Sequence, residues 1–317
     1  MNLEKYFTHF RKNIVGIDQT FITPFGKKKI IYADWIASGR LYKGIEEKLN
    51  KEIFPFVANT HTETSTTGAT MSLAYNESSK IIKDHVGANS DDVLISAGAG
   101  MTSLINKFQR ILGLKIHEKY ISNIKILNRP IVFISHMEHH SNQTSWIETI
   151  AQVEIIPYFK DGNIDLKKFQ NLLNKFKDRE LKIAAITSCS NVTGVHTPYH
   201  EIAELMHEND GLCFVDFACS APYVDINMHP INSKQSLDAI YFSPHKFLGG
   251  PGSTGVLVFN KDLYSNKVPD NPGGGTVDWT NPWGKHKYVN DIEAREDGGT
   301  PAFLQTIKTA LVLKLKD

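Results

Sequence analysis

A lysine and an aspartate stand where two short apolar runs end, and both residue types can carry covalent or acid–base chemistry. Lys246 follows AIYFSPH and precedes the glycine-rich stretch FLGGPGSTG, and Asp216 ends the run LCFVD. A partly desolvated lysine has a lowered pKa and can act as nucleophile and proton carrier. A carboxylate buried without a cationic partner is costly. Taken alone, Lys246 could also be a solvated turn lysine, and Asp216 a helix-capping or salt-bridged residue.

Two further apolar runs lead into groups that could bind a ligand. The run DDVLIS is followed by AGAGMTSLIN, whose glycines lead into a predicted helix with free N–H groups suited to a phosphate. This stretch matches neither the P-loop pattern nor GxGxxG, so a plain strand-to-helix turn stays an alternative. After KIAAITSC comes SNVTG, in which Asn191 could orient a ligand or cap a turn.

A histidine cluster follows the run IVFIS. His136, His139 and His140 lie within HMEHHSN. A zinc site is disfavoured because no cysteine or carboxylate cluster has matching spacing, and histidines in a surface loop are the plain alternative. The sequence therefore predicts no metal.

Together these features match what pyridoxal 5'-phosphate (PLP) needs from a protein. A lysine forms a Schiff base with its aldehyde, and an aspartate keeps its pyridine nitrogen protonated. A helix N-terminus holds the phosphate, and a histidine can stack on the ring. We therefore expect Lys246, Asp216, the turn before Met101 and a histidine of HMEHHSN to meet in one site.

The elements that must position these residues read as an α/β fold. Apolar runs over 91–96, 131–135, 182–188, 212–217 and 239–242 are typical of strands buried on both faces. Helical periodicity over 101–112 and a helix opening at Pro198 alternate with them, which predicts a mostly parallel sheet flanked by helices. Ligands of such sheets bind beyond the carboxyl ends of the strands. The Pro- and Gly-rich stretch 268–285 should be an irregular excursion.

Composition narrows the class of partner and the compartment. The 317 residues carry 35 Lys and Arg against 34 Asp and Glu, a net charge of +1, which gives no field to recruit nucleic acid or an anionic membrane. A small-molecule partner is favoured. Three cysteines without a CxxC pair suit a reducing compartment, and the charged N-terminus resembles neither a signal peptide nor a membrane span. The expected location is cytoplasmic.

The motifs HMEHHSN, SNVTG, VDFACSAPY, SPHKFLGGPGSTG and GGTP, in this order along the chain, resemble the class V aminotransferase family, in the style of its cysteine desulfurase and selenocysteine lyase branch. The resemblance covers about residues 30–317. It implies the fold type I of PLP-dependent transferases, a small amino-acid substrate, and a homodimer with shared active sites. It also implies Lys246 as the Schiff-base lysine, Asp216 as partner of the pyridine nitrogen and His139 as the stacking histidine.

The resemblance assigns further contacts, position by position. Met101 and Thr102 match the phosphate-binding turn, Ser243 and His245 match phosphate contacts, and Asn191 matches an asparagine beside the ring oxygen. The remaining implied positions are Thr300, which reaches the neighbouring subunit's phosphate in the family's dimers, Cys219, which replaces a usual glutamine with a weaker thiol contact, and Ala37, Ser38 and His61 on the substrate side.

The resemblance also divides the chain into an N-terminal arm (1–28), a large PLP-binding domain (29–290) and the start of a truncated small C-terminal domain (291–317). In the family that small domain carries the arginine that grips the substrate carboxylate and the sulfur-accepting cysteine of desulfurases. Without it, we expect an exposed apolar stripe that promotes self-association, formed by Leu304, Ile307, Leu311 and Leu313.

Three functions stay open at this point. The first is a desulfurase- or lyase-type enzyme that removes sulfur or selenium from an amino acid and leaves alanine. The second is another class V aminotransferase or β-elimination activity. The third is a truncated chain that binds PLP weakly without turnover or serves as a dimerising module. A nucleotide-binding oxidoreductase is disfavoured, because no acidic residue follows the glycine turn in the expected setting.

Overall fold

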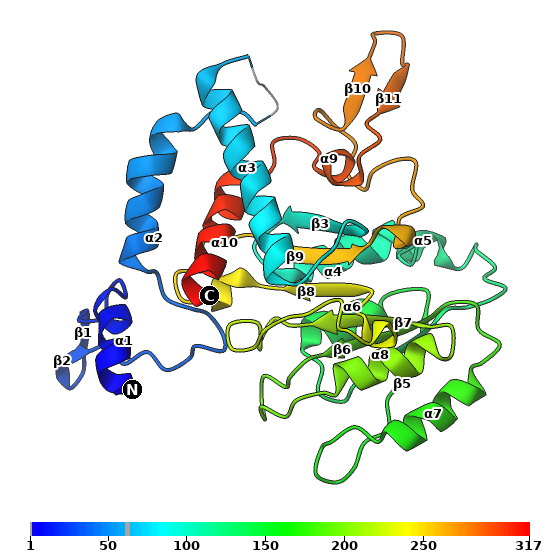
Figure 1. Ribbon diagram of the computed structural model, residues 1–317. Coiled ribbons are helices and arrows are strands. Elements are labelled where there is room, and N and C mark those ends of the chain that lie inside the picture. Colours follow the sequence, from blue (N-terminus) through cyan, green and yellow to red (C-terminus); the bar gives the residue numbers. More distant parts are fainter. Residues whose placement is uncertain (1, 61–63) are drawn as a thin grey trace.

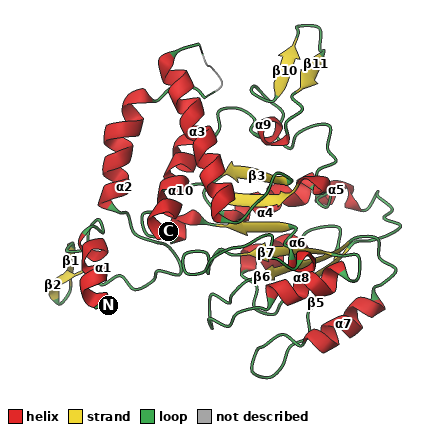
Figure 2. Ribbon diagram, viewed as in Figure 1, coloured by secondary structure: helices red, strands yellow, loops and turns green. Residues whose placement is uncertain are grey.

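A seven-stranded sheet forms the centre of the protein. The computed structural model describes residues 2–60 and 64–317, and Figure 1 and Figure 2 show the sheet between layers of helices. The strand order is β3-β9-β8-β7-β6-β4-β5, and all neighbours are parallel except that β9 runs antiparallel to β3 and β8. The strands are β3 (Asp92–Ala97), β4 (Ile131–Ile134), β5 (Gln152–Ile155), β6 (Lys182–Thr187), β7 (Leu212–Asp216), β8 (Ala239–Phe242) and β9 (Gly255–Asn260).

The predicted α/β fold with a mostly parallel sheet is confirmed. Each of the five predicted apolar runs forms a strand of this sheet, namely β3, β4, β6, β7 and β8. The strands β5 and β9 were not predicted from the sequence. The strand β5 lies at the sheet edge and is half-exposed, so it lacks a continuous apolar run. The strand β9 is buried and apolar, but it directly follows the glycine cluster, which was interpreted as a turn.

Helices cover both faces of the sheet because successive strand residues face opposite layers. Along β4, Ile131 and Phe133 belong to one apolar cluster, and Val132 and Ile134 belong to the other. The first cluster includes side chains of α3 (Thr66–His85), α7 (Leu166–Lys175), α8 (Tyr199–His207) and α10 (Phe303–Lys316). The second includes side chains of α4 (Met101–Ile111) and α6 (His140–Ile147).

Shorter elements lie outside the central sheet. The predicted excursion 268–285 does so too, but it is partly regular, because β10 pairs with β11 in an antiparallel hairpin. Among the described residues no helix is long and apolar enough to span a membrane. The remaining elements are α1 (Leu3–Lys12), β1 (Thr20–Thr23), β2 (Gly26–Lys29), α2 (Lys43–Lys48) with the π-helical turn Leu49–Ile53 and the 3-10 turn Phe54–Phe56, α5 (Glu118–Ile121), the 3-10 turns Ser233–Gln235, Pro244–Lys246 and Lys261–Leu263, β10 (Val277–Thr280), β11 (His286–Tyr288) and α9 (Ile292–Glu296).

The expectation of an exposed apolar stripe on the C-terminal helix is wrong. Ile307 and Leu313 are buried in the core, and Leu304 and Leu311 are half-buried. The reason is that α10 packs against α3, as the red and cyan helices of Figure 1 show. The helix therefore has its own partner within the chain, and the stripe gives no reason for self-association.

We expect Leu313→Ala to destabilise the protein by about 2–5 kcal/mol, because it removes a fully buried side chain and leaves a cavity. Urea unfolding followed by circular dichroism measures this change. Leu73→Ala is the control, because Leu73 is 71% exposed and should leave the free energy of unfolding nearly unchanged. Equal effects of the two substitutions would contradict the packing of α10.

Candidate active site

A cavity of about 450 Å³ opens at the carboxyl ends of the central strands. We call it the Lys246 cavity. Sequence-predicted site residues from six separate segments reach it. Those that line it are Ala37, Met101, Thr102, His139, Asn191, Asp216, Cys219, Ser243, His245 and Lys246.

Three predicted residues are not part of this lining. Ser38 lies directly behind it, and its Oγ donates to the backbone oxygen of His245 at 3.4 Å. Thr300 is exposed in the loop before α10. His61 lies outside the described residues.

Some lining residues were not predicted. Asp34 and Ile36 stand in YADWIASGR and Ser141 in HMEHHSN, so the motifs contained them without singling them out. The others are Thr187, Cys189 and Ala218, each within two residues of a predicted one or of a strand end.

Glycines are required around the Lys246 turn because backbone segments approach one another closely there. Lys246 ends a 3-10 turn that starts at Pro244. A Cβ on Gly250 would lie 1.9 Å from the oxygen of Pro244, and a Cβ on Gly39 would lie 1.8 Å from the oxygen of Phe247. Gly249 has a φ of +83°, a conformation that favours glycine. The turn that presents Lys246 is therefore clamped from both sides.

The helix α4 begins at the cavity and offers an anion-binding end. The backbone N–H of Met101 donates to Ser243 Oγ at 2.9 Å, and Thr102 Oγ1 donates to Ser141 Oγ at 2.9 Å. A Cβ on Gly100 would lie 3.1 Å from Ser243 Oγ, so glycine keeps the helix end accessible to the serine. Free N–H groups and hydroxyls at a helix N-terminus suit a phosphate.

Asp216 presents a buried carboxylate to the cavity. The residue is 2% exposed, and its Oδ1 accepts the N–H of Ala218 at 2.8 Å. Burial raises the pKa of Asp216 to about 6, while the Ala218 N–H and the charge of Lys246 act to lower it. No ion pair with Asp216 occurs within the described part of the chain. A carboxylate in this state fits a cationic ring nitrogen, which would supply the missing charge.

His139 occupies the N-cap position of α6 at the cavity wall. Its Nδ1 accepts the N–H of Ser141 at 3.2 Å. Burial lowers the pKa of His139, and the charges of Lys246 and His140 act in the same direction. The imidazole is therefore neutral at neutral pH, the form that stacks on a flat ring without adding charge.

Two of the three cysteines line the cavity. Cys219 donates its thiol hydrogen to the backbone oxygen of Cys189 at 3.1 Å. Burial raises the pKa of Cys219 to about 12, so it is a thiol at neutral pH. Cys189, which was not predicted from the sequence, also lines the cavity, and Cys213 is buried in β7.

The loop that carries HMEHHSN shows no metal geometry. Among residues 2–60 and 64–317 no three His, Cys, Asp or Glu side chains are placed to share a metal ion. The ring of His136 instead stacks on Tyr158, with centroids 3.8 Å apart.

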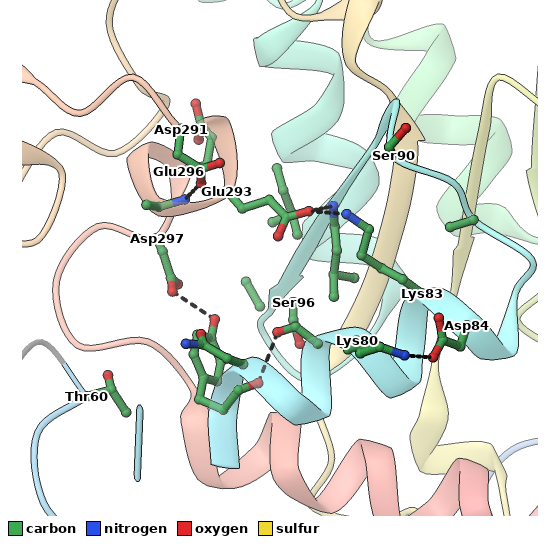
Figure 3. Close-up of a pocket in the computed structure, with 18 of the residues that line it drawn as sticks. Thr60, Lys80, Lys83, Asp84, Ser90, Ser96, Asp291, Glu293, Glu296 and Asp297 are labelled. Atoms are coloured by element: carbon green, nitrogen blue, oxygen red, sulfur yellow. Dashed lines mark hydrogen bonds and ion pairs between the residues drawn. The ribbon is translucent and has the colours of Figure 1, made fainter. Parts of the chain in front are cut away.

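A larger cavity of about 700 Å³ lies elsewhere, between α3, β3 and α9 (Figure 3). Its polar side chains mostly engage one another. Lys83 pairs with Glu293 at 2.8 Å, and the Tyr75 hydroxyl donates to Asp297 at 2.8 Å. Lys80 pairs with Asp84. Because these groups are already paired, the Lys246 cavity is the better candidate for chemistry.

The match to known proteins with similar sequences covers only part of the length of those proteins. A probable cysteine desulfurase of Halalkalibacterium halodurans is 27% identical over 276 residues, which are 86% of this chain and 63% of that protein. A probable cysteine desulfurase of Pyrococcus abyssi is 25% identical over 255 residues, 79% of this chain and 58% of that protein. The chain thus spans less than two thirds of the length of these relatives.

Solved structures and a family model agree on the fold. The apo cysteine desulfurase of Thermococcus onnurineus superimposes with a TM-score of 0.74 at 24% identity, covering 97% of this chain and 70% of that one. A NifS-like protein of Rickettsia africae gives 0.70 at 18% identity, covering 90% and 69%. The predicted fold type I is confirmed by this likeness. The family model for aminotransferase class-V matches residues 31–316, and the chain therefore belongs to the class V aminotransferase family.

Proposed function

We propose that the chain is a PLP-dependent enzyme of the cysteine desulfurase type, which removes sulfur or selenium from a small amino acid and leaves alanine. One observation carries the proposal: the Lys246 amine and the uncompensated Asp216 carboxylate line one cavity beside the N-terminus of α4. The names of the similar proteins point to the same class of reaction.

The cavity residues fit PLP group by group. The first turn of α4, with Ser243 and His245, would hold the phosphate, and Asp216 would hold the ring nitrogen. His139 would lie on the ring face, with Asn191 and Cys219 near the ring oxygen. When bound, PLP supplies an electron sink conjugated to the substrate's α-carbon.

The chain's own residues would then bind the cofactor and move protons. Lys246 would hold the cofactor covalently through its amine and, once displaced by the substrate amine, would carry the proton at the α-carbon. Asp216 would keep the ring nitrogen protonated. Ala37 and Ser38 would bound the substrate side. We also propose a cytoplasmic homodimer in which Thr300 of each chain reaches the other's phosphate.

Another class V reaction, such as transamination, is the second candidate. It is favoured by the state of the cysteines: all three are buried, and Cys219 is an undissociated thiol, so none is a ready sulfur acceptor. Weak PLP binding without turnover is the third outcome that the experiment below distinguishes.

Borohydride reduction of the protein incubated with PLP should fix the cofactor on Lys246, because that amine faces the cavity. Peptide mapping by mass spectrometry locates the label, and visible absorbance reports the binding. Lys246→Ala should lose both signals, and Lys261→Ala, which changes an exposed lysine paired with Asp91, should keep them. Label on another lysine would refute the assignment. Release of sulfide and alanine, of a keto acid, or of no product from added amino acids separates the three candidates.

A further inference from the structure

Glu138 is a carboxylate that the cofactor assignments leave unused, although it immediately precedes His139. It lies between β4 and α6 and accepts four hydrogen bonds. Its Oε1 accepts the N–H of Ser135, the hydroxyl of Ser135 and the N–H of Thr187, the last at 2.9 Å. Its Oε2 accepts Nδ2 of Asn142 at 2.7 Å. The side chain therefore joins the ends of β4 and β6 to the start of α6.

The side-chain amide of Asn142, which donates the fourth bond, has a fixed orientation. Asn142 is fully buried, and its Oδ1 accepts Trp146 Nε1 at 3.1 Å and the Tyr241 hydroxyl at 2.8 Å. Its Nδ2 also donates to the oxygen of Ala185 at 3.1 Å. Glu138 is thus surrounded by donors on both oxygens. All four donors are neutral, and no described lysine, arginine or histidine forms an ion pair with it.

Thr187 connects Glu138 to Asp216. The N–H of Thr187 binds Glu138, and Thr187 is the register partner of Asp216 across β6 and β7. The next N–H, of Ser188, donates to the backbone oxygen of Asp216 at 2.9 Å. Two carboxylates without cationic partners therefore flank the end of β6: Asp216 at the end of β7 on one side, and Glu138 in the link after β4 on the other.

The charge of Asp216 reaches the carboxyl of Glu138. Burial raises the pKa of Glu138 to about 7, its hydrogen bonds oppose the rise, and the charge of Asp216 adds to it. The other titratable groups around the pair are Tyr241 from β8, whose pKa the two carboxylates help to raise, and Lys246, which lowers the pKa of Asp216. Cys219, whose pKa the charge of Asp216 helps to raise, and His139, next in the chain, complete the set.

We propose that Glu138 is a positioning residue for Asp216: its negative charge, held behind the Lys246 cavity, makes the two carboxylates ionise as a coupled pair and strengthens the hold of Asp216 on a cationic ring nitrogen. This inference rests on the proposed function for the identity of that cation. The coupling itself belongs to the chain alone and can be tested without cofactor.

The first test measures the free energy of unfolding by urea at pH 5 and pH 8 in the wild type, Glu138→Gln, Asp216→Asn and the double variant, all without PLP. A carboxylate whose pKa is raised by folding keeps its proton longer in the folded state, so stability falls as pH rises towards that pKa. For each protein, the loss of unfolding free energy between pH 5 and pH 8 is measured, and the loss of the double variant is subtracted as background. Coupling predicts that the corrected loss of the wild type exceeds the sum of the corrected losses of the two single variants. Equal sums would overturn the proposal.

In Glu138→Gln an NH₂ group replaces one accepting oxygen and faces another donor, which opposes folding. If this variant does not fold, a second variant keeps the test decisive. Asp216→Asn alone removes the charge that raises the pKa of Glu138. The pH at which the Glu138 carboxyl ionises, followed by its infrared absorption, should therefore lie lower in Asp216→Asn than in the wild type. An unshifted ionisation pH would overturn the proposal.

The third test measures the dissociation constant of PLP by absorbance. At pH 8, Glu138→Gln should weaken binding by about three- to tenfold, the effect of one charge at moderate effective dielectric. In the Asp216→Asn background the same substitution should change nothing, and Glu138→Asp, which keeps the charge, should bind as the wild type does. An equal weakening in both backgrounds would show a merely structural role and refute the proposal. If the wild type binds no PLP, the proposed function fails, and the cofactor-free tests still decide the coupling.

Discussion

Asp216→Asn should lower turnover by about 10²- to 10³-fold, the cost typical of removing one preorganised electrostatic partner from an active site. Asparagine keeps an oxygen that can accept the N–H of Ala218, so the fold should survive. It carries no negative charge, however, and cannot keep a ring nitrogen protonated. Turnover at matched cofactor occupancy, with the cofactor spectrum after adding amino acids, measures the loss.

Asp216→Asn should also change how the stability of the protein depends on pH. Folding raises the pKa of Asp216 from 3.8 to about 6, so the folded state retains a proton that the unfolded chain has lost. Its contribution to stability is therefore fully present below pH 3.8 and decreases as pH rises to about 6. Asp216→Asn should flatten this decrease. Asp262→Asn, at an exposed position, is the control, and an unchanged spectrum and rate in Asp216→Asn would remove Asp216 from the site.

Gly39→Ala should disable the site from a position outside the cavity lining. The new methyl group would meet the backbone oxygen of Phe247 at 1.8 Å, and neither is the end of a flexible side chain. The segment that carries Ala37 and Ser38 must then separate from the turn that carries Lys246. We expect a loss of about 1–3 kcal/mol in stability from overpacking, and about 100-fold in cofactor labelling rate, as a displacement of 1 Å can cause.

Gly274→Ala is the matched control for this substitution. A Cβ on Gly274 would meet nothing within 4 Å, and its φ is not in the left-handed region. Urea unfolding and the rate of borohydride-fixed labelling on Lys246 compare the two variants. If Gly39→Ala behaves like Gly274→Ala, the clamp on the Lys246 turn does not exist as described.

The central fold was predictable because it rests on continuous apolar runs. Strands buried on both faces give such runs, and all five predicted ones are in the sheet. The edge strand β5 was missed because one side of it meets solvent. The exposed stripe on α10 was mispredicted because the sequence does not show that α3, more than 200 residues earlier, packs there.

The site was predictable where a motif and a strand end coincide. Asp216 ends one buried strand and Lys246 follows another, and parallel strands bring such ends together. Glu138 was not singled out, although it stands inside HMEHHSN, because the neighbouring histidines are the usual carriers of chemistry. Its significance depends on the N–H of Thr187, a contact across 49 residues that no local pattern shows.

Because β9 runs antiparallel to β8, the connection that carries Lys246 differs in kind from the connections that carry Asp216 and His139. Lys246 lies in the short link 243–254 between two neighbouring strands, β8 and β9, although Gly39 and Met101, far away in sequence, also contact this link. Asp216 and His139 end strands β7 and β4 or follow them, and their neighbours are joined by long parallel crossovers. Contacts distant in sequence form more slowly than local ones. The strand–turn–strand unit that carries Lys246 can therefore form early, but the cavity is complete only when the parallel strands and the segment of Gly39 are also in place.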